Sequence, residues 1–161
     1  MIVTIWIALA LFVAGEFEPR TSRSLQSAAR CLFLLGALIC VAHIVLTMSH
    51  VHGWSHAAAM DATAAQTNAI YGVRWGGGVY VNYVFAAVWI ADAVQRLVAP
   101  ASFARRSRAL VWTLRAFYFV IIVNAAVIFA APGRRWLGMV ICVSLAIAWA
   151  GKAHMKEREG R

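Results

Sequence analysis

Four of the five histidines of this chain lie in one short stretch, from His43 to His56. The tightest group follows the pattern H-x-H-x3-H and consists of His50, His52 and His56, with Met60 four residues further on. Neutral imidazole is the commonest biological metal ligand. Imidazole with thioether suits copper, and imidazole with carboxylate suits zinc or iron. The pattern therefore predicts a metal or redox site for copper, zinc or iron, or else a set of polar anchors at a membrane surface.

A second polar set lies inside the apolar runs and consists of His43, Asn82 and Asn124. Counting from the ends of their runs, all three are expected at similar depth in the outer half of a membrane. Histidine and asparagine side chains can form hydrogen bonds between membrane helices and hold a bundle together. The alternative is a polar pocket that binds a cofactor, in which His43 and Asn124 would hold a quinone or a lipid headgroup.

Two charged residues, Asp92 and Arg115, interrupt neighbouring apolar runs. Each lies about six residues, or about 9 Å along a helix, inside the same end of its run. Charges inside a bilayer are costly and usually have a partner, so we expect these two to form an ion pair. The pair would lock two helices together or, less favoured, serve as the gate of a small transporter. Glu16 is assigned to another loop and is not expected to join it.

Motifs for other chemistry are missing from the sequence. It contains no G-x-S-x-G elbow and no dinucleotide fingerprint. The run Gly76-Gly77-Gly78 lacks the Lys and Ser/Thr that a phosphate-binding loop needs. The three cysteines, Cys31, Cys40 and Cys142, form no C-x-x-C pair. These observations favour a protein that is not an enzyme.

The composition is that of an integral membrane protein. Of 161 residues, 63% are hydrophobic and 13% are charged, whereas soluble domains have about 45–50% and about 25%. The net charge of +9 comes from 15 Lys and Arg against six Asp and Glu. The basic residues lie between and after the apolar runs, which indicates a lipid bilayer and not nucleic acid as the partner.

Five apolar runs predict an all-α fold, a single domain of five transmembrane helices. The expected spans are about 2–17, 31–49, 78–98, 109–131 and 136–152. A span needs about 20 residues, so the short first and fifth runs leave four spans as the alternative. Residues 50–77 form an outer segment, in which Ser55 is expected to cap a short helix that Gly72 ends.

The distribution of basic residues predicts the orientation. With the N-terminus outside and the C-terminus in the cytoplasm of a bacterium, the cytoplasmic segments are 16–30, 99–108 and 152–161. They hold most of the basic residues: Arg20, Arg23, Arg30, Arg105, Arg106, Arg108, Lys152, Lys156, Arg158 and Arg161. The outside segments hold only Arg74, Arg134 and Arg135. Cleavage of the first run as a signal peptide would reverse this positive-inside bias, so we expect the run to be retained in the inner membrane.

The central part of the chain carries a recognisable pattern. It reads Trp54-Ser55-His56, then W-G-G-G-x-Y-x-N-Y from Trp75 to Tyr83, then Trp89-x-x-Asp92. This pattern resembles a group of uncharacterised small polytopic bacterial membrane proteins. The resemblance implies a multi-pass bacterial membrane protein and brings no activity with it.

Three functions remain open from the sequence. The first is a non-enzymatic subunit or scaffold of a membrane complex, whose outer segment binds other subunits or a cofactor. The second is an extracytoplasmic metal-handling or redox protein that uses the histidine cluster. The third and weakest is a small transporter.

Overall fold

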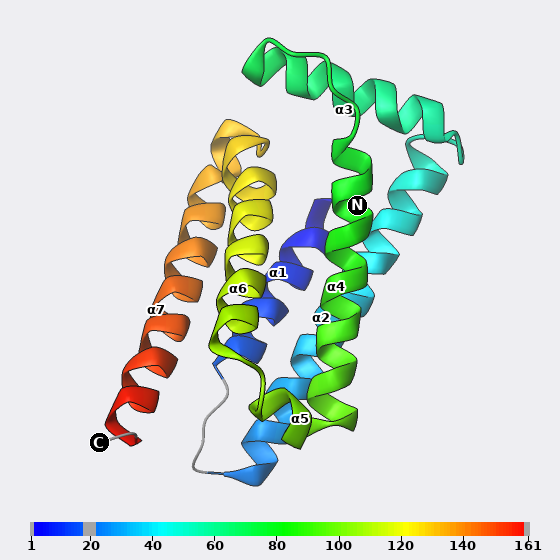
Figure 1. The fold of residues 1–161 in the computed structure, drawn as a ribbon. Helices are drawn as coiled ribbons and strands as arrows, with labels where there is room; N and C mark the ends of the chain where they lie inside the picture. Colours follow the sequence, from blue (N-terminus) through cyan, green and yellow to red (C-terminus); the bar gives the residue numbers. More distant parts are fainter. Residues whose placement is uncertain (1, 18–21, 160–161) are drawn as a thin grey trace.

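The computed structural model describes residues 2–17 and 22–159, and the side chains of residues 3–17 and 22–152. Throughout this part of the chain the regular structure is helical, and it contains no strand. The long helices run up and down a bundle, and α3 lies across one end of it (Figure 1). The elements are α1 (Ile2–Glu16), α2 (Arg23–His50), α3 (His56–Tyr71), α4 (Gly78–Val98), α5 (Pro100–Ala104), α6 (Arg108–Val123), a π-helix (Asn124–Ile128), a 3₁₀ turn (Pro132–Arg134) and α7 (Arg135–Glu159).

Four helical segments are long and apolar enough to cross a membrane: Arg23–His50, Gly78–Val98, Arg108–Ile128 and Pro132–Lys152. The prediction of a multi-pass helical membrane protein is therefore confirmed, whereas five spans are not. The first apolar run forms α1, which has only 15 residues. Such a helix is about 22 Å long, against a hydrocarbon core of about 30 Å.

Although it is short, α1 lies at the centre of the hydrophobic core. The Phe12 ring is fully buried and lies 4.9 Å from the rings of both Phe33 on α2 and Trp89 on α4. It also lies 5.0 Å from the ring of Tyr118 on α6. Tilted and edge-on ring pairs at such distances are favourable beyond the area that they bury. This aromatic cluster fixes α1 between the longer helices.

Close approach of α1 and α2 depends on two glycines. A Cβ on Gly15 would lie 2.6 Å from the Cβ of Phe33. A Cβ on Gly36 would lie 3.0 Å from the carbonyl oxygen of Ala8 and 2.9 Å from the Trp89 ring. Small residues at such positions allow membrane helices to pack through their backbones. The packing brings the end of α1, with Glu16, against the neighbouring helices.

The outer segment folds as its local signals predict. The Ser55 side chain accepts a hydrogen bond from the Ala58 amide at 3.2 Å and caps α3. Gly72 ends the helix in the left-handed conformation, with φ of 72°. Before Ser55, Gly53 and Trp54 have φ of 54° and 61°, and the chain turns there from α2 into α3.

α6 and α7 meet at an irregular turn. The predicted span 109–131 continues α6 as a π-helix, Asn124–Ile128, and α7 packs against it. A Cβ on Gly138 would overlap the carbonyl oxygen of Ala126, so only glycine fits there. The two helices are thus tied together by backbone contact near the α3 end of the bundle.

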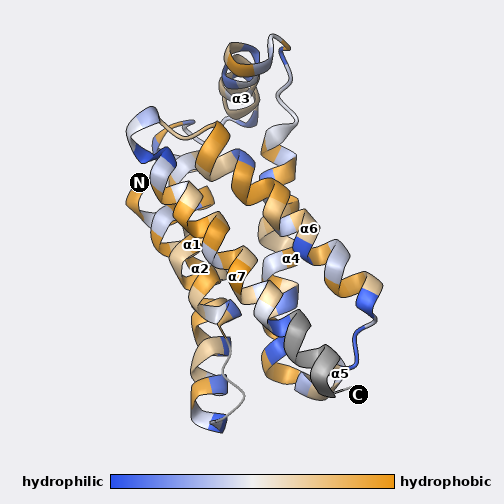
Figure 2. Cartoon of the chain, turned by 90° about the vertical axis from the view of Figure 1, so that its left-hand side faces the viewer, coloured by the Kyte–Doolittle hydropathy of each residue, from blue (hydrophilic) through white to orange (hydrophobic). Residues whose placement is uncertain are grey.

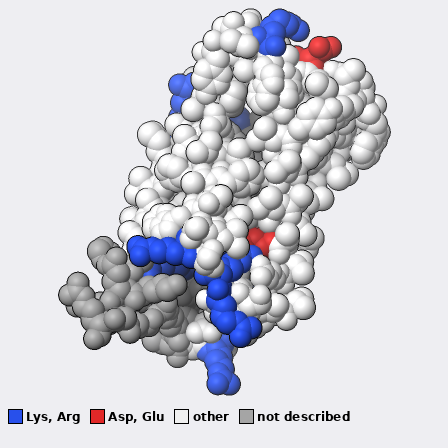
Figure 3. Space-filling view, viewed as in Figure 1, with Lys and Arg blue, Asp and Glu red and all other residues white. Residues whose placement is uncertain are grey.

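Polarity is distributed along the bundle axis. Figure 2 shows hydrophobic residues over the middle of the long helices and hydrophilic residues toward their ends. Figure 3 shows Lys and Arg gathered toward the α5 end, with a wide uncharged face above them. This pattern is that of a protein surrounded by lipid, with polar groups at two water-facing ends.

Candidate functional site

The main polar feature of the bundle is a charge network near its α5 end. Its centre consists of Glu16, the last residue of α1, and of Asp92 and Arg96, one turn apart on α4. These three residues are only 4%, 3% and 6% exposed. Arg106, in the turn between α5 and α6, adds a fourth charge.

Arg96 connects the two carboxylates. Its Nη2 donates to Glu16 Oε1 at 2.5 Å and to Asp92 Oδ2 at 3.0 Å. Its guanidinium carbon lies 3.7 Å from the centre of the Phe33 ring and 4.9 Å from that of Phe103. The planar cation is therefore held at its edge by carboxylates and on its faces by aromatic rings, an arrangement that suits arginine and not lysine.

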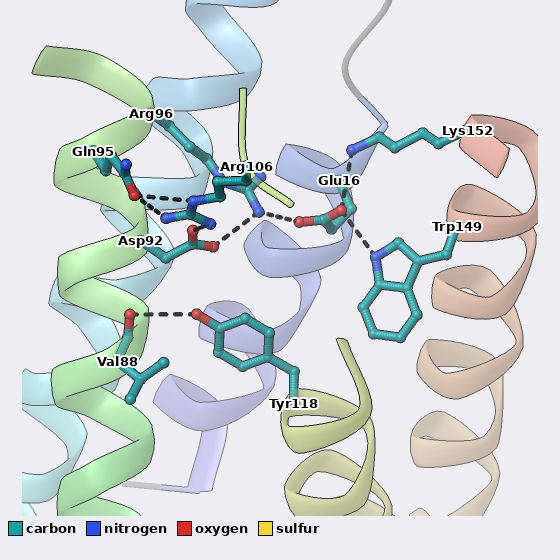
Figure 4. A network of polar contacts seen from close by, with 9 residues as sticks. All are labelled: Glu16, Val88, Asp92, Gln95, Arg96, Arg106, Tyr118, Trp149 and Lys152. Carbon is teal, nitrogen blue, oxygen red and sulfur yellow. Dashed lines mark hydrogen bonds and ion pairs between the residues drawn. The ribbon is translucent and has the colours of Figure 1, made fainter. Parts of the chain in front are cut away.

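Asp92 has a second cationic partner. Arg106 donates through Nη1 to Asp92 Oδ1, and through Nε to Gln95 Oε1 at 3.0 Å. Gln95 in turn donates to Ser102 Oγ at 3.3 Å. These contacts fold α5 and the following turn back onto the last turn of α4. Figure 4 shows Arg106 and Arg96 approaching Asp92 together.

Glu16 is held from its other side by α7. The Trp149 indole Nε1 donates to Glu16 Oε2 at 2.9 Å, and Lys152 Nζ lies 3.0 Å from the same oxygen. In Figure 4 the carboxylate of Glu16 points between α4 and α7, with its partners on both sides. The end of α1 thus joins helices that are far apart in the sequence.

The network brings together two carboxylates and three cations, from Glu16, Asp92, Arg96, Arg106 and Lys152. Each carboxylate contacts two cations. Breaking a buried ion pair by removing one partner costs about 3–5 kcal/mol, and the second cation keeps each carboxylate from being left alone. The geometry is that of a clamp between α1, α4, the α5–α6 turn and α7.

A layer of aromatic residues separates the charge network from the middle of the bundle. Tyr118 on α6 is 2% exposed, and its hydroxyl donates to the Val88 carbonyl oxygen at 3.3 Å (Figure 4). Its ring lies 5.0 Å from Phe12 and 5.9 Å from Phe85. The charges therefore lie between this apolar layer and the α5 end, not in the middle of the bundle.

The predicted ion pair between Asp92 and Arg115 is not formed. Asp92 contacts Arg96 and Arg106 instead. Arg115 faces α7, and its guanidinium carbon lies 5.3 Å from the Trp112 ring centre and 5.7 Å from that of Trp149. Equal depth does not make two residues neighbours, because each must also face the other around its helix axis.

The predicted polar layer of His43, Asn82 and Asn124 is not assembled either. His43 Nδ1 lies 2.8 Å from Thr4 Oγ1 on α1. Asn124 Oδ1 accepts from the Tyr71 hydroxyl at 3.2 Å, and the Asn82 side chain is exposed. His43 therefore joins α2 to α1, and Asn124 joins the π-helix to α3. Hydrogen bonds of this kind connect helices in membrane bundles.

The histidine cluster does not form a common site. His56 lies between two aromatic rings, 5.2 Å from Tyr80 and 5.9 Å from Tyr83, and its Nδ1 is 3.5 Å from the Tyr83 hydroxyl. His50 is exposed at the end of α2, and His52 lies in the turn that follows. Among the described side chains, those of residues 3–17 and 22–152, no group of three His, Cys, Asp or Glu could hold a metal ion. Met60 contacts Gly76 through its backbone, which positions the loop before α4.

Asp92 is predicted from the sequence as a buried charge, but most of its surroundings are not. The prediction places Glu16 in another loop and gives Arg96 no partner. Trp149 and Lys152 lie 133 and 136 residues after Glu16, so no local spacing connects them. One partner of Asp92 does have a signal in the sequence. Arg96 lies one turn after Asp92 on the same helix face, and this spacing permits an ion pair.

Function must therefore be inferred from the geometry of this network and of the outer segment, because no family model, no curated protein and no solved structure matches this chain.

Proposed function

We propose that this protein is a non-enzymatic subunit or scaffold of a bacterial inner-membrane complex. Its bundle would hold residues 50–77 on the outer face of the membrane, where they bind another protein of the complex. The pattern from Trp54 to Asp92 would place it with the group of small polytopic bacterial membrane proteins that it resembles.

The observation that supports this proposal is the surface of the outer segment. Six large apolar side chains of residues 50–77 are exposed: Val51, Trp54, Ile70, Tyr71, Val73 and Trp75. Exposed apolar groups gathered on one feature mark interaction sites more often than single ones do. Aromatic residues are also the residue types that dominate binding at interfaces.

Trp54 strengthens the case. It is 65% exposed and has a positive φ of 61°. A bulky residue in the left-handed region costs free energy, and such strain collects at functional sites. The conformation belongs to the turn that ends α2, in which the Trp54 amide donates to the Met48 carbonyl oxygen at 2.8 Å, and it leaves the ring exposed for contact with a partner.

The charge network supports a scaffold more than a transport pathway. Both buried carboxylates contact two cations each. A proton relay needs a carboxylate that can release its partners. Here the cationic partners come from three parts of the chain, α4, the α5–α6 turn and α7, and release would separate helices that the network joins.

The proposed orientation rests on the positive-inside bias. Among the described side chains, the basic residues at the α5 end are Arg23, Arg30, Arg96, Arg105, Arg106, Arg108 and Lys152. At the α3 end they are Arg74, Arg134 and Arg135. Arg20, Lys156, Arg158 and Arg161, which contributed to the prediction, lie outside the described side chains.

The orientation can be tested with single cysteines in a variant lacking Cys31, Cys40 and Cys142. Ser55→Cys should react with an impermeant maleimide added to intact spheroplasts, because α3 would face outward. Ser102→Cys should react only after the membrane is opened. The reverse labelling pattern would overturn the orientation.

The docking surface can be tested with a photo-reactive amino acid at Trp54 or Trp75 in living cells. Both positions should give a protein adduct of one discrete mass. The matched control is Val143, equally exposed at 58% but in the middle of a span, which should react only with lipid. Absence of protein adducts at both tryptophans would contradict the proposal.

A further inference from the structure

Arg115 is a charged residue inside the span Arg108–Ile128, and it forms none of the ion pairs of the charge network. It lies seven residues after Arg108, the first residue of α6, and thus about 10 Å along the helix axis. Its described contacts are the two tryptophan rings of Trp112 and Trp149. Within the described side chains no carboxylate pairs with it.

The direction of the side chain brings the guanidinium toward the α5 end of the bundle, where the residue is half-buried. Side chains on a helix point toward its N-terminus, and the N-terminus of α6 lies at the α5 end. The position of the guanidinium over Trp112, one turn earlier, agrees with this direction. Long basic side chains near span ends reach the headgroup region in this way.

The surroundings favour a ligand from the lipid. Trp112 is 46% exposed and lies one turn after the start of the span Arg108–Ile128, and tryptophans near span ends are typical of the membrane interface. The flanking residues Arg105 and Arg108 are exposed at the same end, so the local field is positive. Guanidinium binds phosphate through paired charge-assisted hydrogen bonds.

We infer that Arg115, with Trp112 and Trp149, binds the phosphate of an anionic phospholipid in the leaflet at the α5 end. Arg115 supplies the charge and the donors. The two rings hold the guanidinium in position, and Trp149 connects the site to Glu16 through its indole N–H. The inference is independent of any partner at the outer segment.

Native mass spectrometry of the full chain in mild detergent tests this inference, with dioleoyl phosphatidylglycerol as the probe. Arg115→Gln should weaken retention of the first bound lipid about tenfold, because a charge-assisted contact is lost. The matched control Arg105→Gln, an exposed arginine at the same end, should change it by less than about twofold. Equal losses in both variants would overturn a specific site.

Further measurements distinguish a lipid phosphate from inorganic phosphate and from a carboxylate of a partner protein. Inorganic phosphate at millimolar concentration should not displace the lipid, and displacement would overturn the lipid assignment. Loss of a co-purifying membrane protein in Arg115→Gln, with lipid retention unchanged, would overturn it in favour of a partner carboxylate. Should Arg115→Gln fail to fold, Arg115→Lys and Trp112→Leu provide the test, and unchanged lipid binding in both would refute the site.

Discussion

The two ends of this bundle are built from different interactions. At the α5 end, charged groups are buried and each carboxylate has two cationic partners. At the α3 end, neutral hydrogen bonds join the helices, such as those of Thr4 with His43 and of Tyr71 with Asn124. There the large side chains of the outer segment are exposed. One end fixes the helices, and the other presents a surface.

The difference has a physical basis. Charges out of water interact strongly, so the loss of one partner is costly and the remaining partners hold their positions. Neutral hydrogen bonds between membrane helices contribute less, about 0.6 kcal/mol on average. The α3 end can therefore rearrange around a partner without loss of the bundle.

The largest expected effect comes from removal of the central cation. Arg96→Leu should lower the free energy of unfolding by about 3–5 kcal/mol, because the buried carboxylates of Glu16 and Asp92 would each lose one of two cationic partners and the hydrogen bond that it donates. Thermal or denaturant unfolding in detergent, followed by circular dichroism, measures it. Arg105→Leu, an exposed arginine at the same end, should change stability by less than about 0.5 kcal/mol.

A compensated variant sharpens this prediction. Arg96→Met together with Glu16→Gln, Asp92→Asn, Arg106→Gln and Lys152→Met removes the charges on all five residues of the network. It should regain much of the stability that Arg96→Leu loses, since neutral replacement of a whole buried ion cluster is often tolerated. A fivefold variant as unstable as Arg96→Leu would show that packing of Arg96, not charge, holds this end.

Backbone contact near the α3 end should give the next effect. Gly138→Ala forces α7 away from the Ala126 carbonyl and should cost about 1–3 kcal/mol in the same unfolding assay. Gly151→Ala, in the same helix, meets nothing within 4 Å and should be neutral or stabilising. Equal effects of the two substitutions would refute the close approach.

Smaller effects are expected for neutral hydrogen bonds. Tyr71→Phe removes the bond to Asn124 and should cost about 0.6 kcal/mol. Hydrogen exchange should increase in α3 and hardly at all around Asp92. Tyr80→Phe is the control, since the described contacts of Tyr80 are made by its ring. Faster exchange around Asp92 would contradict the independence of the two ends.

The smallest effect is expected for His50→Ala combined with His52→Ala. His50 is exposed at the end of α2 and His52 is half-buried in the turn that follows, so stability should change by less than about 0.5 kcal/mol. Elemental analysis of the purified protein adds a second measurement. Stoichiometric copper, zinc or iron that disappears in this variant would restore the metal hypothesis.

The sequence predicts those parts of the fold that local signals determine. The span 78–98 coincides with α4, and Ser55 and Gly72 bound α3 because a cap and a left-handed turn depend on adjacent residues. The partners of Asp92 could not be predicted in this way. Arg106 comes from the turn that follows α5. Arg96 also donates to Glu16, which lies 80 residues away in the sequence. Such choices depend on the rotation of each helix about its axis, which hydrophobic runs do not specify.

The position of Glu16 also has a consequence for biosynthesis. Its carboxylate emerges from the ribosome 80 residues before Arg96 and 133 and 136 residues before Trp149 and Lys152. Before these partners are synthesised, α1 is a short apolar helix with an unpaired charge at its end, and it is poorly suited to cross the bilayer alone. Its final seating therefore depends on residues of α7, so α1 reaches its place only after helices that follow it in the sequence have been made.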